Sequence, residues 1–173
     1  PGQGQKYIGM LRELACLFPQ VQQALAEADA ADGDEPTRLS DRVYPFPAFT
    51  EVDCAAQDQA LRQTQVAQPA IGAVSLGLLR VLDHFGVRPD AVAGHSFGEL
   101  TALCAAGWID EEAFARLSRA RGRLMAAQAE TGGGSMLAAL APLGVVEEVI
   151  RSERLDLVIA NKNGPRQFVL SGP

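Results

Sequence analysis

One five-residue motif constrains the fold of this chain more than any other feature. The motif is Gly94-His95-Ser96-Phe97-Gly98, which fits Gly-x-Ser-x-Gly and lies between a short apolar segment, residues 91–94, and a predicted helix over residues 97–106. In that context the serine sits on a sharp strand-to-helix turn that exposes its hydroxyl group. The motif therefore predicts a nucleophile, Ser96, with the Phe97 N–H and the helix N-terminus directed at developing negative charge.

Hydrophobic periodicity predicts helices and strands that alternate along the chain. Helices are expected over residues 7–18, from residue 19 onward, and over 53–62, 68–85, 97–106, 110–128 and 143–152; strands are expected over 91–94, 135–141, 155–160 and 167–171. Gly86 and Gly107 are typical of helix ends, and Asp110 is typical of an N-cap. Such alternation predicts an α/β fold with a parallel sheet and flanking helices.

The composition of the 173 residues indicates a soluble globular domain, because 47% are hydrophobic and only 21% are charged. The net charge of −6 argues against a nucleic-acid partner, which requires a basic surface. No apolar run reaches the length of a membrane span, and the three cysteines are widely spaced without a Cys-x-x-Cys pair. We therefore expect a cytoplasmic protein with no membrane partner, no disulfide framework and no bound metal.

A nucleophilic serine needs a general base, and the chain holds only two histidines, His84 and His95. His95 is adjacent to Ser96, and neighbours in an extended segment point to opposite sides, so His95 is a poor base. His95 either supports the sharp turn at Ser96 (the nucleophile elbow) or contacts substrate. His84, at a helix end, is expected on the surface. Because the chain begins at Pro1 without a Met and stops directly after an apolar run, we interpret it as a piece of a longer polypeptide that carries the base elsewhere.

An arginine interrupts the apolar face predicted for the helix over residues 110–128. At 100° per residue that face is formed by Phe114, Leu117, Leu124 and Met125, with Arg121 in its middle and Arg116, Arg119 and Arg123 on the opposite side. A buried guanidinium without a partner is costly. Arg121 therefore requires an internal carboxylate or an anionic ligand, unless it snorkels past the helix edge. A ligand carboxylate suits its bidentate fork.

Four motifs in this order resemble the malonyl-CoA:acyl-carrier-protein transacylase family. They are the start Pro1-Gly2-Gln3-Gly4, the serine motif followed by Glu99, the inward Arg121, and the segment Asn163-Gly164-Pro165-Arg166-Gln167 leading to Val169-Leu170-Ser171-Gly172. The resemblance covers the whole chain. Within the family, the chain is similar to the acyltransferase domains of polyketide and polyunsaturated-fatty-acid synthases. The resemblance implies that residues 1–173 are a partial acyltransferase domain, the α/β-hydrolase-like large subdomain. The small ferredoxin-like subdomain would then be mostly absent, and the catalytic His would lie beyond Pro173.

The resemblance also implies a role for each candidate site residue. Ser96 would be the acyl-enzyme nucleophile, Gln3 and the Phe97 N–H would hold the oxyanion, Arg121 would pair with the free carboxylate of malonyl, and His95, Asn161 and Asn163 would lie against substrate. In the family a bulky apolar residue at the position of Phe97 is typical of selection for malonyl over methylmalonyl, so the resemblance implies malonyl as the acyl group. No metal and no permanently bound cofactor are expected.

The implied reaction is transfer of a malonyl group from CoA to the phosphopantetheine thiol of an acyl carrier protein. Its partners would be that carrier protein and neighbouring synthase domains. Two alternatives remain open. A serine hydrolase or thioesterase shares the elbow but has no need for Arg121. The other alternative is a degenerate, non-catalytic docking domain, although the intact serine motif, Gln3 and Arg121 argue against loss of catalytic function.

Overall fold

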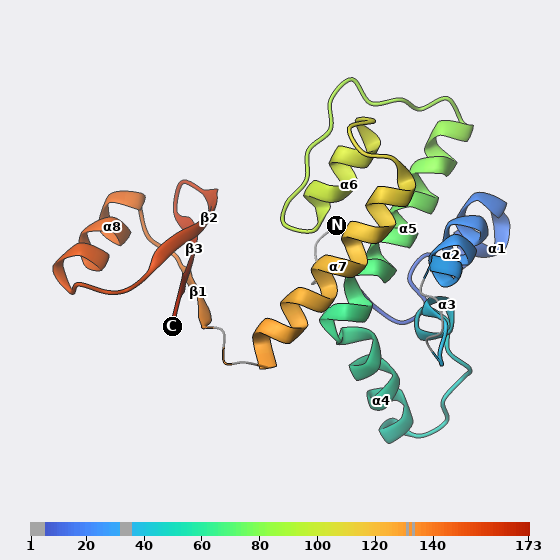
Figure 1. Ribbon diagram of the computed structural model, residues 1–173, viewed down its shortest axis with the longest axis horizontal. Helices are drawn as coiled ribbons and strands as arrows, with labels where there is room; N and C mark the ends of the chain where they lie inside the picture. The colour runs from blue at the N-terminus through green and yellow to red at the C-terminus, as the bar shows by residue number, and fades with distance from the viewer. Residues whose placement is uncertain (1–5, 32–35, 131, 133) are drawn as a thin grey trace. The chain divides into compact units, whose positions relative to one another are not determined.

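Helix α5 (Thr64–His84) organises the first part of the chain because its N-terminal half is apolar on nearly every side and is buried. The computed structural model describes residues 6–31, 36–130, 132 and 134–173. These form two units, a helical unit (Pro1–Ala126) and a sheet unit (Ala127–Pro173), each of which is described separately (Figure 1).

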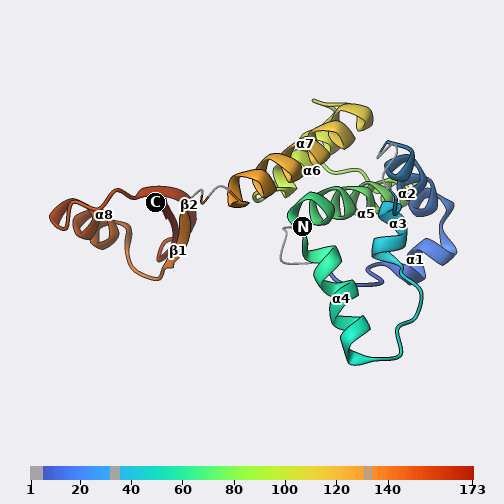
Figure 2. The ribbon, with the colours of Figure 1, turned by 60° about the horizontal axis from the view of Figure 1, so that its bottom comes forward.

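The helical unit surrounds α5 with shorter helices (Figures 1 and 2). These are α1 (Arg12–Leu17), α2 (Pro19–Ala31), α3 (Leu39–Val43), α4 (Glu51–Arg62), α6 (Gly98–Ala105) and α7 (Glu111–Glu130). One apolar cluster lies between α5 and the elements before it, with Val21, Leu25, Val43, Leu61 and Val74 among its members. A second cluster joins α2 and α5 to α6 and α7 through Ala24, Ile71, Leu76, Phe97 and Phe114. This second cluster is the one that positions the serine motif.

The ends of α5, α6 and α7 follow the predicted capping residues. Gly86 has φ of 73°, and Val87 N–H donates to the Leu82 carbonyl, which is a Schellman ending for α5. Gly107 ends α6 with the same φ of 73°. The Asp110 carboxylate accepts a 2.7 Å hydrogen bond from the Ala113 N–H and caps α7. These caps fix where the loops around the serine motif begin and end.

Other predicted boundaries were wrong for local reasons. The helix expected over residues 7–18 begins only at Arg12, because Gly9 and Leu11 have φ of 77° and 54° and cannot continue a right-handed helix. Helix α5 begins at Thr64 instead of residue 68, with Pro69 inside it. Residues 91–94 pair with no described strand, so they form no assigned strand, since a strand requires a hydrogen-bonded neighbour.

The sheet unit contains β1 (Ser135–Ala139), α8 (Leu143–Ser152), β2 (Val158–Gly164) and β3 (Gln167–Gly172). The strand order is β1-β3-β2, and both pairs are antiparallel, with Leu170 opposite Leu137 and Ile159. Helix α8 covers one face by packing Val146 with Phe168 and Leu170.

The expectation of a parallel sheet was wrong for these three strands. Residues 165–166 connect β2 to β3 as a short turn, and such a turn can join only antiparallel neighbours. The order β-α-β-β matches the first four elements of the ferredoxin-like β-α-β-β-α-β pattern.

Gly77 allows α2 and α5 to approach closely. A Cβ atom added at residue 77 would lie 2.9 Å from the Val21 Cα, which is backbone, so α2 would have to shift. We expect Gly77→Ala to lower the free energy of unfolding by about 1–3 kcal/mol despite the higher helix propensity of alanine. Denaturant titration measures this change. The matched control is Gly144→Ala in α8, where an added Cβ meets nothing within 4 Å. Equal stability of Gly77→Ala and wild type would contradict the prediction.

Helix α5 is also long and apolar enough, by composition, to cross a membrane, which the sequence analysis did not anticipate. Of its apolar stretch, 67% is buried within the structure, as in the core helix of a globular domain. No other helix among the described residues meets the same criteria. The burial of α5 thus accounts for its composition without a membrane.

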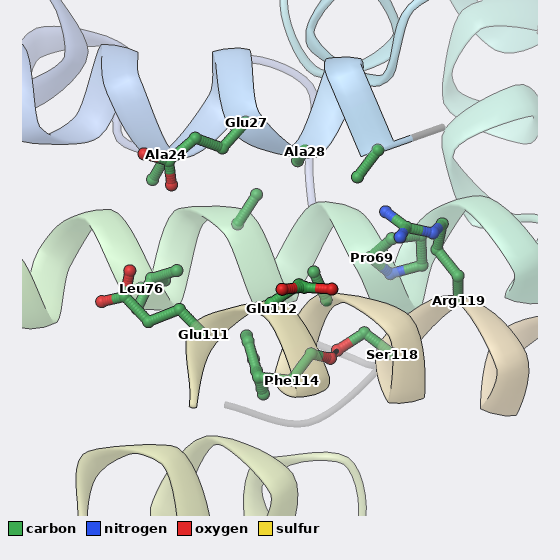
Figure 3. A pocket seen from close by; sticks show the side chains of 13 residues that line it. Ala24, Glu27, Ala28, Pro69, Leu76, Glu111, Glu112, Phe114, Ser118 and Arg119 are labelled. Carbon is green, nitrogen blue, oxygen red and sulfur yellow. Dashed lines mark hydrogen bonds between the residues drawn. The ribbon is translucent and has the colours of Figure 1, made fainter. Parts of the chain in front are cut away.

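An apolar groove of about 330 Å³ runs between α2, α5 and α7 (Figure 3). Ala24 and Ala28 line it from α2, opposite Phe114 and Ser118 of α7. Arg80 of α5 ties the two flanking helices together by donating to the carboxylates of Glu27 and Glu111, and these hydrogen bonds raise the pKa of Arg80. The groove includes neither Ser96 nor Arg121, so it is separate from the serine motif.

Candidate active site

The backbone at Ser96 has the strained geometry that a nucleophile elbow requires. Its φ is 55°, in the left-handed region that L-residues other than Gly, Asn and Asp seldom adopt. The turn is closed by the Gly98 N–H, which donates to the His95 carbonyl at 2.9 Å, and by the Glu99 N–H, which donates to the Ser96 carbonyl at 3.1 Å. Helix α6 starts at Gly98. Ser96 is consequently exposed at the tip of a sharp turn.

The glycine before the serine is required by close backbone contact. A Cβ atom added at Gly94 would lie 2.1 Å from the Gly98 carbonyl oxygen and 2.4 Å from the Glu99 nitrogen. No side chain fits there, because both of these atoms are backbone. The Gly-x-Ser-x-Gly spacing therefore follows from the tightness of the turn.

The Phe97 N–H lies at the start of α6 and donates no hydrogen bond to any residue that the structure describes. A free N–H at a helix N-terminus is a suitable donor to an oxyanion. The Phe97 ring points away from solvent and is 0% exposed, with its centroid 6.2 Å from that of Phe114. Any influence of this ring on the choice of acyl group must therefore act through packing. Gln3, the second predicted oxyanion donor, lies outside the described residues.

Arg121 of α7 is directed toward the elbow. Its Nη2 donates to the Ser96 Oγ at 3.4 Å, and its Nη1 donates to the Gln68 Oε1 at 2.8 Å. No carboxylate pairs with Arg121 anywhere in residues 6–31, 36–130, 132 and 134–173. The internal ion pair that the sequence left open is thus absent from the described residues. A guanidinium beside a serine hydroxyl, with no carboxylate partner among the described residues, is well placed to receive an anionic ligand.

Comparison with known proteins agrees with this geometry, because the chain matches the acyl transferase domain family over residues 1–173. It belongs to that family. It is 41% identical over 172 residues to a type I polyketide synthase for phenolphthiocerol synthesis from Mycobacterium marinum, covering 99% of this chain and 8% of the synthase. It is 36% identical over 178 residues to the malonyl CoA-acyl carrier protein transacylase of Escherichia coli O157:H7, covering 99% of this chain and 53% of that protein.

A solved complex of a malonyl transacylase with the acyl carrier protein of a type II polyketide synthase has the same fold. The TM-score is 0.80 at 33% identity, over 99% of this chain and 53% of that chain. The likeness shows the acyltransferase fold. The chain spans about half the length of the transacylase it matches and less than a tenth of the synthase.

The other predicted site residues lie beside Ser96 or in the sheet unit. His95 is exposed beside Ser96, and His84 is exposed at the end of α5, with its ring against Phe85. Asn161 and Asn163 lie in β2 of the sheet unit, where Asn161 is half-buried and Asn163 is exposed. Their approach to Ser96 remains a prediction. Among the described residues, no group of three His, Cys, Asp or Glu side chains could hold a metal ion.

Sequence reasoning missed Gln68, the fully buried partner of Arg121. It also misjudged the apolar face of α7, because only Phe114 is buried there, whereas Leu117, Leu124 and Met125 are 42%, 71% and 43% exposed. Phe114, Ser118 and Arg121 turn toward α5 and the start of α6, and Met125 reaches Gln68 of α5 only through its sulfur atom. The available signal was a polar residue directly before Pro69, within residues 66–74, which are otherwise apolar.

Cys104 of α6 is unsuited to nucleophilic chemistry. Burial raises the pKa of its thiol, and the carboxylates of Glu111 and Asp110 raise this pKa further. At a given pH a higher pKa leaves less thiolate. We therefore expect iodoacetamide to alkylate Cys104 more slowly than the exposed Cys16 and Cys54 near pH 8, as peptide mass spectrometry would measure. Labelling of Cys104 first would contradict this expectation.

Proposed function

We propose that this chain is part of an acyltransferase that moves a malonyl group from CoA to the phosphopantetheine thiol of an acyl carrier protein. One observation carries the proposal: Arg121, unpaired with any described carboxylate, lies 3.4 Å from the Ser96 hydroxyl. A fixed positive charge at that place selects an acyl group with a free carboxylate at its far end. An enzyme for uncharged acyl chains would gain nothing from a charge there.

The proposed reaction has two steps. Ser96 Oγ attacks the thioester carbonyl while a general base takes its proton, and the Phe97 N–H and Gln3 donate to the oxyanion. The C–S bond then breaks, CoA leaves as the thiol, and malonyl remains as an ester on Ser96. In the second step the sulfur of the carrier thiol attacks the carbonyl of this ester and forms a thioester with malonyl. The C–O bond to Ser96 breaks, and Ser96 Oγ receives the proton that the general base took from the thiol.

The remaining parts of the proposal concern residues whose roles rest on the family resemblance. The general base is a His outside the 173 residues, and His95, Asn161 and Asn163 lie against substrate. Residues 91–94 join a parallel sheet in the complete domain, of which residues 1–173 supply the large subdomain while most of the small one lies elsewhere. The protein works in the cytoplasm beside neighbouring synthase domains, with no resident cofactor.

Intact-protein mass spectrometry on the complete acyltransferase domain tests the proposal. The domain is incubated separately with malonyl-CoA and acetyl-CoA, and then with a carrier protein that bears phosphopantetheine. We expect a malonyl adduct that exceeds the acetyl adduct and that passes to the carrier. Thioester loss to water without an adduct would indicate a hydrolase. No adduct and no thioester loss would indicate a non-catalytic docking domain.

A further inference from the structure

Gln68 stands out as a polar side chain in the second turn of α5, within the buried apolar half of that helix. It is 0% exposed, and its neighbours Ala67, Pro69 and Ala70 are also buried. Burying an amide without hydrogen bonds costs a few kcal/mol, so its partners matter. Both partners lie on α7: Oε1 accepts from Arg121 Nη1 at 2.8 Å, and Nε2 donates to the Met125 Sδ at 3.1 Å.

The chemistry of these partners fixes the orientation of the amide. A guanidinium has donors only, so it must face the amide oxygen, which leaves the amide nitrogen for the sulfur acceptor of Met125. The bond to Oε1 in turn holds Nη1 of Arg121 against α5. The other nitrogen, Nη2, is thereby held toward the Ser96 hydroxyl at 3.4 Å.

The neutrality of this anchor matters as much as its geometry. A carboxylate at residue 68 would hold Arg121 equally well, but it would form an ion pair and cancel the charge before substrate arrived. An amide oxygen accepts the same hydrogen bond and leaves the full positive charge available. Of the described side chains near Arg121, Gln68 is its sole recorded hydrogen-bond acceptor besides Ser96.

We infer that Gln68 is a positioning residue, which fixes Arg121 toward Ser96 without neutralising the charge that binds the free carboxylate of the acyl group. This inference rests on the proposed transacylase function. It assigns donor selectivity to two residues from different helices rather than to Arg121 alone.

The experiment measures kcat/KM for acyl loading from malonyl-CoA and from acetyl-CoA in the complete domain. The decisive variant is Gln68→Glu, which keeps the size of the side chain and its acceptor for Arg121, adds a negative charge, and loses the Nε2 donor to the Met125 sulfur. We expect the malonyl-to-acetyl ratio to fall about tenfold or more, because the charged pair competes with the substrate carboxylate. Loading of acetyl should fall less than loading of malonyl, because acetyl has no carboxylate for Arg121 to bind.

Two further variants separate positioning from general damage. In an Arg121→Ala background, Gln68→Glu should leave the ratio unchanged, because a residue that acts through Arg121 has no effect without it. The matched control is Ser118→Ala, which removes a buried hydroxyl of α7 whose hydrogen bond, among the residues that the structure describes, goes to the Phe114 carbonyl of its own helix. This control should keep the wild-type ratio of malonyl to acetyl loading, even if the substitution lowers the thermal unfolding midpoint.

The outcomes distinguish this inference from the proposed function. A wild-type ratio in Gln68→Glu, or an equal effect of Gln68→Glu with and without Arg121, would overturn the inference and leave the transacylase intact. Failure of the wild type to prefer malonyl would overturn the proposed function and the inference with it. Equal loss of malonyl and acetyl loading in Gln68→Glu would show a structural role and also overturn the inference.

Discussion

Ser96→Ala will form no acyl-enzyme from malonyl-CoA, and transfer to the carrier protein will fall by about 10⁶-fold, as in enzymes that lose their serine nucleophile. The reason is chemical, because no other described hydroxyl or thiol occupies the tip of the elbow. Cys104, the thiol nearest in sequence, is half-buried with a raised pKa. Intact mass after incubation with malonyl-CoA measures the adduct directly. An adduct of equal yield in Ser96→Ala would place the nucleophile elsewhere.

A second variant at the same position tests the strain of the elbow apart from its chemistry. Ser96 has φ of 55°, and glycine adopts that conformation without the clash between Cβ and backbone. Ser96→Gly should therefore raise the free energy of unfolding by about 1 kcal/mol while abolishing the adduct. Ser96→Ala keeps the strain and should leave stability nearly unchanged. A less stable Ser96→Gly protein would contradict the strained geometry.

Sequence patterns predicted best those features that a few neighbouring residues determine. The glycines after α5 and α6, the aspartate cap of α7 and both ends of α8 are local matters of backbone conformation and hydrogen bonding. The elbow is local too, since Gly94 and Gly98 touch one another across a single turn. For this reason the serine motif was recognisable without any knowledge of the sheet.

Features that depend on distant partners were not predictable in the same way. An apolar run such as residues 91–94 predicts a strand, but only a neighbouring strand makes it one. The direction of β2 and β3 depends on the short turn between them, which alternation of strands and helices does not reveal. The pairing of Gln68 with Arg121 joins residues 53 positions apart, so neither residue alone indicates the other.

Arg121→Ala is the second large effect that we expect. Without the guanidinium the free carboxylate of malonyl has no positive partner beside Ser96, so kcat/KM for malonyl loading should fall by about 100-fold. Acetyl has no carboxylate, so acetyl loading should be unchanged or raised. The preference between the two donors is therefore the quantity to measure, in parallel assays with malonyl-CoA and acetyl-CoA.

Helix α7 provides a matched control for the charge itself. Arg123 lies two residues from Arg121 on an exposed part of the same helix, and it makes no hydrogen bond to Ser96 or Gln68. Arg123→Ala removes the same unit of charge and should leave the donor preference as in wild type. Arg121→Lys keeps the charge but loses the planar fork, because an ammonium cannot bond to Gln68 and a carboxylate in the same geometry. Its preference should fall between wild type and Arg121→Ala. Similar losses in Arg121→Ala and Arg123→Ala would mean that the helix attracts the donor through overall charge, and that Arg121 does not select the acyl group.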